Sequence, residues 1–219
     1  MKKHWWKALG IVLVIYTIVF GFIGEVPRLP ILNETIRNLY FHVTMWFAMV
    51  ILMTASLVYS INYLRNGNLT TDLKAKELAI TGFFMASLGL VTGSVWAKFT
   101  WGTFWTNDPK LNGTAVTMLI YLAYFVLRGS VDDPQKKGRL SAVYNIFAYV
   151  MMIVFIGILP RLTDSLHPGN GGNPGFGGYD LDGTMRIVFY PAVIGWTLIG
   201  IWITNLKIRY QKLLWKKNA

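Results

Sequence analysis

Long runs of apolar residues, separated by short polar or charged segments, dominate the chain. Each run approaches the roughly 20 residues that an α-helix needs to cross a bilayer. The pattern predicts an all-α, polytopic membrane protein, a bundle of six transmembrane helices. The predicted helices cover residues 5–23, 40–63, 78–95, 113–127, 142–159 and 187–206. Because the fourth run is short, its helix is expected to begin near Leu111.

Composition supports the membrane assignment and limits the chemistry. The 219 residues are 54% hydrophobic and 14% charged, with a mean hydropathy of +0.44, which is too apolar for a soluble domain of this size. No internal repeat or linker divides the sequence, so residues 1–219 are expected to form a single membrane domain. The lack of cysteine excludes disulfides, thiolate metal sites and covalent c-type haem attachment. The sequence has no Gly-x-x-x-x-Gly-Lys-Ser/Thr loop, so an ATP-driven step would require a partner.

The basic residues divide unequally between the two sides of the membrane. Fifteen of the 21 Lys and Arg residues fall on the side that holds both predicted termini, and six on the other. Because positively charged loops tend to stay cytoplasmic, both termini are predicted to be cytoplasmic. Residues 24–39, 96–112 and 160–186 then form outer loops. This asymmetry accounts for the net charge of +11 without a nucleic acid partner.

The first apolar run follows basic residues, as the apolar core of a signal peptide does. Bulky side chains, however, stand at positions 20–27, where a signal peptidase requires small residues. The first run is therefore predicted to be a retained transmembrane helix.

Two of the three histidines are candidates for a cofactor site. His42 lies in the first turn of the second predicted helix, where an ionisable group at the membrane edge indicates either a function or a hydrogen bond to lipid or water. His167 lies in the third outer loop, on the same side. Two imidazoles from different elements can bind haem iron from opposite faces, so the pair suggests a haem site. His4 is surrounded by lysines and is expected to be solvated.

An aromatic segment, residues 96–105, lies on that same outer side. Its large rings fall within ten residues, whereas the aromatic belts of membrane proteins are spread around the molecule. A helical conformation would place Trp101 and Trp105 on one face beside Phe104, as a surface for a flat macrocycle. Gly102 would let the backbone approach that ligand. The rings are those of Trp96, Phe99, Trp101, Phe104 and Trp105.

Polar and glycine-rich residues follow the aromatic segment. Asp108 precedes Pro109, which predicts a turn there. Lys98 and Lys110 flank the segment, where they could pair with haem propionates or simply anchor the protein at the interface. Residues 168–179 are rich in glycine and are predicted to be flexible, and residues 180–183 are predicted to form a turn before the sixth helix.

The stretch Trp101-Gly-Thr-Phe-Trp-Thr-Asn-Asp-Pro-Lys-Leu111 resembles the tryptophan-rich WWD domain of the CcmC family. These are haem-handling membrane proteins of bacterial cytochrome c maturation, and they typically read Trp-Gly-x-Trp-Trp-x-Trp-Asp-x-Arg there. The resemblance covers the whole chain, with six spans and the motif between the third and fourth. One histidine lies at the outer start of the second span, and one lies in the outer loop between the fifth and sixth. Trp101, Gly102, Trp105 and Asp108 match, whereas Phe104 and Asn107 replace Trp and Lys110 replaces Arg.

The resemblance implies a haem-presenting protein of the bacterial inner membrane that is not itself an enzyme. His42 and His167 correspond to the two haem-ligand histidines of the family, which would hold haem b non-covalently. The family implies delivery of haem to a periplasmic CcmE-like chaperone, in a complex with CcmA-like and CcmB-like ABC subunits and a small CcmD-like subunit. The residues that it assigns beside the haem are Trp96, Trp101, Gly102, Phe104, Trp105 and Asp108.

Two other functions fit parts of the pattern. A b-type cytochrome subunit would bury haem between histidine pairs inside facing helices, but here one histidine lies in a loop. A permease would use the tryptophans only as an interfacial belt, but no charged residue lies in the middle of a predicted span. Both alternatives rank below haem handling.

Overall fold

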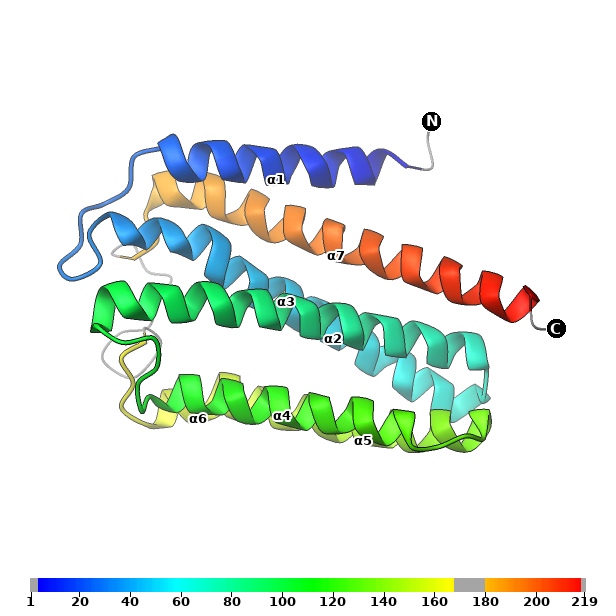
Figure 1. Cartoon of the computed structure of the whole chain (residues 1–219). Coiled ribbons are helices and arrows are strands. Elements are labelled where there is room, and N and C mark those ends of the chain that lie inside the picture. Colours follow the sequence, from blue (N-terminus) through cyan, green and yellow to red (C-terminus); the bar gives the residue numbers. More distant parts are fainter. Residues whose placement is uncertain (1–3, 168–179, 218–219) are drawn as a thin grey trace.

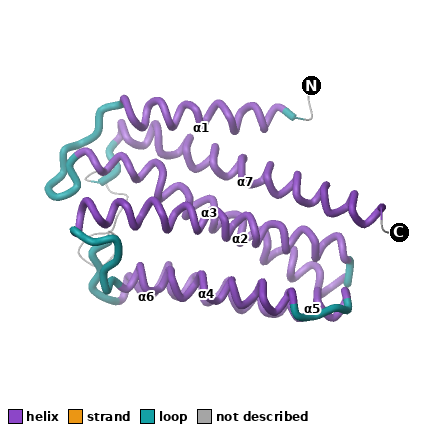
Figure 2. Tube along the Cα trace, viewed as in Figure 1, coloured by secondary structure: helices purple, strands orange, loops and turns teal. Residues whose placement is uncertain are grey.

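Helices make up nearly all of the chain that the computed structural model describes, residues 4–167 and 180–217 (Figure 2). Six helical spans in this part are long and apolar enough to cross a membrane, which confirms the predicted number. Helix α5 continues through a π-helix, η2 (Ile153–Ile158), into α6 (Leu159–Leu162), and these three form one span. A short 3-10 helix, η1 (Glu34–Asn38), precedes α2. The long helices are α1 (Trp5–Ile23), α2 (Leu39–Asn66), α3 (Leu69–Trp101), α4 (Pro109–Gly129), α5 (Pro134–Met152) and α7 (Gly183–Lys217).

The six spans form three antiparallel pairs, α1 with α7, α2 with α3, and α4 with α5 (Figure 1). Helix α2 also contacts α5 and α7, so it lies at the centre of the bundle. Both termini lie at one end, here called the terminal end. The opposite end, the loop end, holds the connections between α1 and α2, α3 and α4, and α6 and α7.

Capping residues explain where the helices begin and end. The side chains of Asn68, Asp108 and Asp133 each accept hydrogen bonds from backbone N–H groups in the first turn of α3, α4 and α5. Proline stands at the first position of α4 and α5, where its missing N–H costs nothing. Gly102 ends α3 with φ +80°, a left-handed conformation that glycine adopts without strain.

Helices α3 and α7 are longer than the predicted apolar runs, and α7 continues to Lys217 where residue 206 was the expected end. Helix α3 begins at Leu69 and ends at Trp101, so it runs through the charged residues before the apolar run and into the aromatic segment. The fourth helix begins at Pro109, close to the expected start, because Asp108 caps it.

Near the loop end, the fifth span changes from α-helix to the π-helix η2, which no sequence pattern indicated. A Cβ on Gly113 of α4 would lie 2.3 Å from the carbonyl oxygen of Phe155, so α4 packs directly against the η2 backbone. This contact holds the element that leads into the loop carrying His167.

The turn predicted for residues 180–183 is present and begins α7. The Asp182 side chain accepts a hydrogen bond from the backbone N–H of Met185 at 2.7 Å. The predicted flexible run 168–179 lies outside the described residues.

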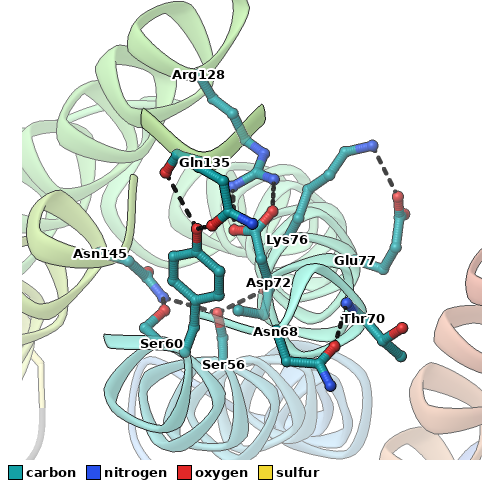
Figure 3. Close-up of polar contacts among 12 residues, drawn as sticks. Ser56, Ser60, Asn68, Thr70, Asp72, Lys76, Glu77, Arg128, Gln135 and Asn145 are labelled. Atoms are coloured by element: carbon teal, nitrogen blue, oxygen red, sulfur yellow. Dashed lines mark hydrogen bonds and ion pairs between the residues drawn. The ribbon is translucent and has the colours of Figure 1, made fainter. Parts of the chain in front are cut away.

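Polar side chains at the terminal end bond to one another (Figure 3). Asp72 of α3 and Arg128 of α4 form a buried two-point ion pair. The amide of Asn145 donates to the hydroxyls of Ser56 and Ser60, both at 2.8 Å. Such pairs connect neighbouring helices where burial of an unpaired polar group would be costly.

Candidate functional site

Two histidines from distant parts of the sequence lie at the loop end. His42 lies in the first turn of α2, and His167 lies in the loop after α6. The two imidazoles are close enough to interact electrostatically, and Lys110 at the start of α4 interacts with His42 in the same way. The structure therefore brings together the two histidines that the sequence singled out.

The imidazole of His42 is held by the backbone of α3. Its Nδ1 lies 2.8 Å from the carbonyl oxygen of Gly89, and the Thr92 hydroxyl lies farther away, at 3.5 Å. A carbonyl oxygen only accepts, so Nδ1 must carry the proton and donate it. In that tautomer Nε2 carries the lone pair that a metal ion requires.

Close packing of α2 against α3 gives His42 its place. A Cβ on Gly93 would lie 2.4 Å from Cε1 of the His42 ring, and a Cβ on Gly89 would lie 2.9 Å from the Trp46 ring. Only glycine leaves room for the two rings at these positions. The sequence reasoning missed both glycines, although small residues four apart on an apolar helix are a known signal of close helix packing.

Asp108 connects the start of α4 to the loop that carries His167. The whole residue is only 2% exposed. Oδ1 accepts from the backbone N–H groups of Lys110 and Leu111, at 2.9 and 3.3 Å, as a helix cap does. Oδ2 accepts from the hydroxyl of Ser165 and the N–H of Leu166, both at 2.8 Å. The carboxylate thus fixes the loop to the helix.

The same carboxylate orients His167, whose Nδ1 lies 2.9 Å from Oδ1 of Asp108. Burial by itself raises the pKa of Asp108, but the hydrogen bonds from His167, Ser165 and Leu166 outweigh it and hold that pKa below its usual range. The carboxylate is therefore ionised and accepts, so Nδ1 of His167 donates. As in His42, this leaves the lone pair of the neutral ring on Nε2.

A carboxylate or carbonyl that fixes the second ring nitrogen is the usual support of a metal-bound histidine. Among the described residues, no hydrogen bond reaches Nε2 of His42 or His167. Within those same residues no cluster of three or more His, Asp or Glu side chains forms a metal site. The donor set is thus two imidazoles, which suits a metal that brings its own equatorial ligands, as haem iron does.

The tryptophans of the aromatic segment contact the histidines edge to face. The ring of Trp96 lies 5.9 Å from that of His42, and the ring of Trp101 lies 4.9 Å from that of His167, both near perpendicular. The indole N–H of Trp96 also donates to the Thr35 hydroxyl at 3.0 Å. These two tryptophans support the imidazoles from the side.

The shared helical face considered for Trp101 and Trp105 is wrong, because α3 ends at Trp101 and is followed by the left-handed Gly102. A Cβ at Gly102 would meet no described atom within 4 Å, so space does not require glycine there. The left-handed backbone conformation does. Phe104 and Trp105 are exposed, and the Nζ of Lys98 donates to the Gly102 carbonyl oxygen and lies over the Phe104 ring. The aromatic segment therefore divides into a supporting part and an exposed part.

Comparison with known proteins identifies the family of the chain. Residues 2–219 match the model of the CcmC family, described as "Heme exporter protein C". The chain belongs to the CcmC family. This CcmC protein is 27% identical over 166 residues to heme exporter protein C of Rhodobacter capsulatus, covering 76% of this chain and 68% of that protein. It is 24% identical over 222 residues to heme exporter protein C of Escherichia coli, covering 97% of this chain and 85% of that protein.

A second set of relatives matches a shorter stretch of the CcmC chain. The cytochrome c biogenesis protein CcsA of Prochlorococcus marinus is 33% identical over 105 residues, which is 48% of this chain and 32% of that protein. The family assignment and the six spans make this a multi-pass membrane protein.

Proposed function

We propose that this protein binds haem b between His42 and His167 at the loop end and presents it for cytochrome c maturation. The observation that carries the proposal is that both imidazoles are held in the same tautomer, with the proton on Nδ1. Each Nδ1 donates to a fixed oxygen, of Gly89 or of Asp108, so each Nε2 is left to bind iron. The names of the relatives, heme exporter protein C and CcsA, support the same role.

Each residue of the site has a distinct task in this proposal. His42 sits on a rigid helix, whereas His167 sits on a loop that the Asp108 carboxylate ties to α4. Haem bound by both imidazoles would have low-spin iron with no open coordination position. In this proposal Asp108 acts by positioning His167, to which its carboxylate is bonded.

Lys110 suits a haem propionate better than Lys98 does. Lys110 interacts electrostatically with His42, with Arg161 and with the Asp108 carboxylate, which is already bonded to His167. Lys98 is already engaged with the Gly102 carbonyl oxygen and the Phe104 ring. A carboxylate near Lys110 and Arg161 would relieve the repulsion between them.

The loop end is proposed to face the periplasm, across the bacterial inner membrane. Most of the basic residues lie at the terminal end, which favours a cytoplasmic location for that end. Phe99, Phe104 and Trp105 are exposed beside the site, and Phe99 is 74% exposed. This exposed aromatic group would dock a periplasmic CcmE-like chaperone that receives the haem, with CcmA-like, CcmB-like and CcmD-like subunits completing the complex.

A haem titration of the purified protein in detergent tests the proposal. Wild type is compared with His42→Ala and His167→Ala, with His4→Ala as the matched control because His4 is exposed at the terminal end. The proposal predicts tight binding by wild type and His4→Ala, and much weaker binding by the other two variants. Equal affinity of all four proteins would reject it and favour a permease.

A further inference from the structure

A shallow groove of about 500 Å³ lies between the end of α4 and α5, where it is lined by α5 residues from Lys136 to Phe147. Its floor is apolar, and its rim carries the charged side chains of Lys136 and Arg139. The residues that line it are Leu127, Lys136, Arg139, Leu140, Val143, Tyr144 and Phe147. On α5 these residues follow one face, because they recur every three or four positions.

The charges around the groove favour an anion. Arg128, the nearest cation on α4, is engaged by Asp72 and buried. Among the described residues, no carboxylate lines the groove. The side chain of Asp133, which precedes α5 in sequence, accepts the backbone N–H of Lys136 as the α5 cap. Lys136 and Arg139 are exposed, and neither forms an ion pair with a described residue. Two cations therefore border an apolar groove.

The depth of these groups matches a phospholipid. Val143 and Phe147 are exposed on a membrane-spanning helix, so hydrocarbon covers them in the bilayer. Lys136 and Arg139 lie in the first two turns of that helix, where it enters the head-group region. A molecule with an anionic head and an apolar chain would bind the two cations with its head and the apolar floor of the groove with its chain.

We propose that this groove binds an anionic phospholipid. Its phosphate would pair with Lys136 and Arg139, and one acyl chain would lie over Val143 and Phe147. The lipid would brace the α4–α5 pair, which leads at its other end to Asp108 and to the loop of His167. The proposal does not depend on haem, and it can fail while the haem site stands.

Thermal unfolding of the delipidated full-length protein tests the proposal. Dioleoyl phosphatidylglycerol and dioleoyl phosphatidylcholine are added in turn to the detergent-solubilised protein, because a ligand that binds the native state raises its unfolding temperature. The expected result for wild type is a larger increase with phosphatidylglycerol. The Lys136→Gln/Arg139→Gln variant should bind this lipid roughly 30-fold more weakly.

Two further variants separate the groove from general surface charge. Val143→Trp fills the groove without changing charge and should also lose the preference for phosphatidylglycerol. Lys216→Gln/Lys217→Gln removes two exposed cations from the same end of the bundle and should keep the preference for phosphatidylglycerol. Equal loss in both double variants would overturn the proposal in favour of diffuse attraction. Unchanged lipid binding in the groove variants would also overturn the proposal. If a partner subunit co-purified less with these variants than with wild type, the groove would instead be a surface where a partner helix docks.

Discussion

At the terminal end several buried polar side chains bond across helices, whereas at the loop end two histidines each use one ring nitrogen and keep the other available. Asp72 and Arg128 neutralise each other, and Asn145 binds two serines. His42 and His167 instead receive their support from a backbone carbonyl and from Asp108. The polar groups at the terminal end join neighbouring helices, while each imidazole at the loop end is fixed at Nδ1 and leaves Nε2 without a hydrogen bond from the described residues.

The aromatic residues show the same contrast. Tyr121 and Tyr124 are buried in the core near the middle and terminal part of α4. Phe99, Phe104 and Trp105 are exposed at the loop end, outside both buried clusters. The difference separates residues that hold the bundle together from residues proposed to meet a partner. Substitutions at the two ends should therefore have different effects.

The largest effect on stability is expected for Arg128→Ala. It would leave the Asp72 carboxylate buried without its partner, which typically costs about 3–5 kcal/mol. Thermal or denaturant unfolding in detergent measures the loss. The Asp72→Leu/Arg128→Met variant is the control, because replacing both charges by apolar groups is often close to neutral. Equal destabilisation by the single and double variants would show that the ion pair is not the cause.

Gly93→Ala tests the close contact that positions His42. The added methyl group would overlap the imidazole, so the ring must move, at a cost of about 1–3 kcal/mol for overpacking. Haem affinity should fall because Nδ1 would leave the Gly89 carbonyl oxygen. Gly129→Ala is the matched control, because a Cβ there would meet no atom within 4 Å. Unchanged haem affinity in Gly93→Ala would mean that the orientation of His42 does not matter.

Asp108→Asn tests the support of His167 while keeping the cap of α4, since Asn caps helices about as well as Asp. The amide cannot accept the hydrogen bonds from Ser165 and Leu166 with its nitrogen, and it lacks the negative charge beside the ring. Loss of such a supporting residue typically lowers metal affinity about 10–100-fold. Haem titration measures the change. Destabilisation without weaker haem binding would assign Asp108 a purely structural role.

The smallest effect is expected for Phe104→Ala and Trp105→Ala. Both side chains are exposed, so stability should change by less than about 0.5 kcal/mol. Haem affinity should also stay close to that of wild type, and transfer to a CcmE-like chaperone should slow. Release of haem to the purified chaperone measures the effect, and normal transfer would remove these residues from the docking surface.

Hydropathy predicted the six spans well, because each apolar run is long enough to identify a helix on its own. It also placed His42, His167 and the aromatic segment at one end. The bond between His167 and Asp108 joins residues 59 positions apart, and no local pattern reveals such a pair. The role of Gly89 and Gly93 was not predicted, because glycine is common in membrane helices. The need for glycine at these positions comes from the rings of Trp46 and His42 that pack against them. The aromatic segment was assigned as one surface, whereas the glycine that ends α3 divides it.

The spectrum of bound ferric haem is the most direct test of the two-histidine site. Electron paramagnetic resonance and visible absorption are recorded for wild type, His42→Gly and His167→Gly, each with and without added imidazole. The account predicts low-spin iron in wild type, loss of that signature in each variant, and its recovery when imidazole fills the space left by the missing ring. Low-spin spectra that persist in both variants without imidazole would contradict it.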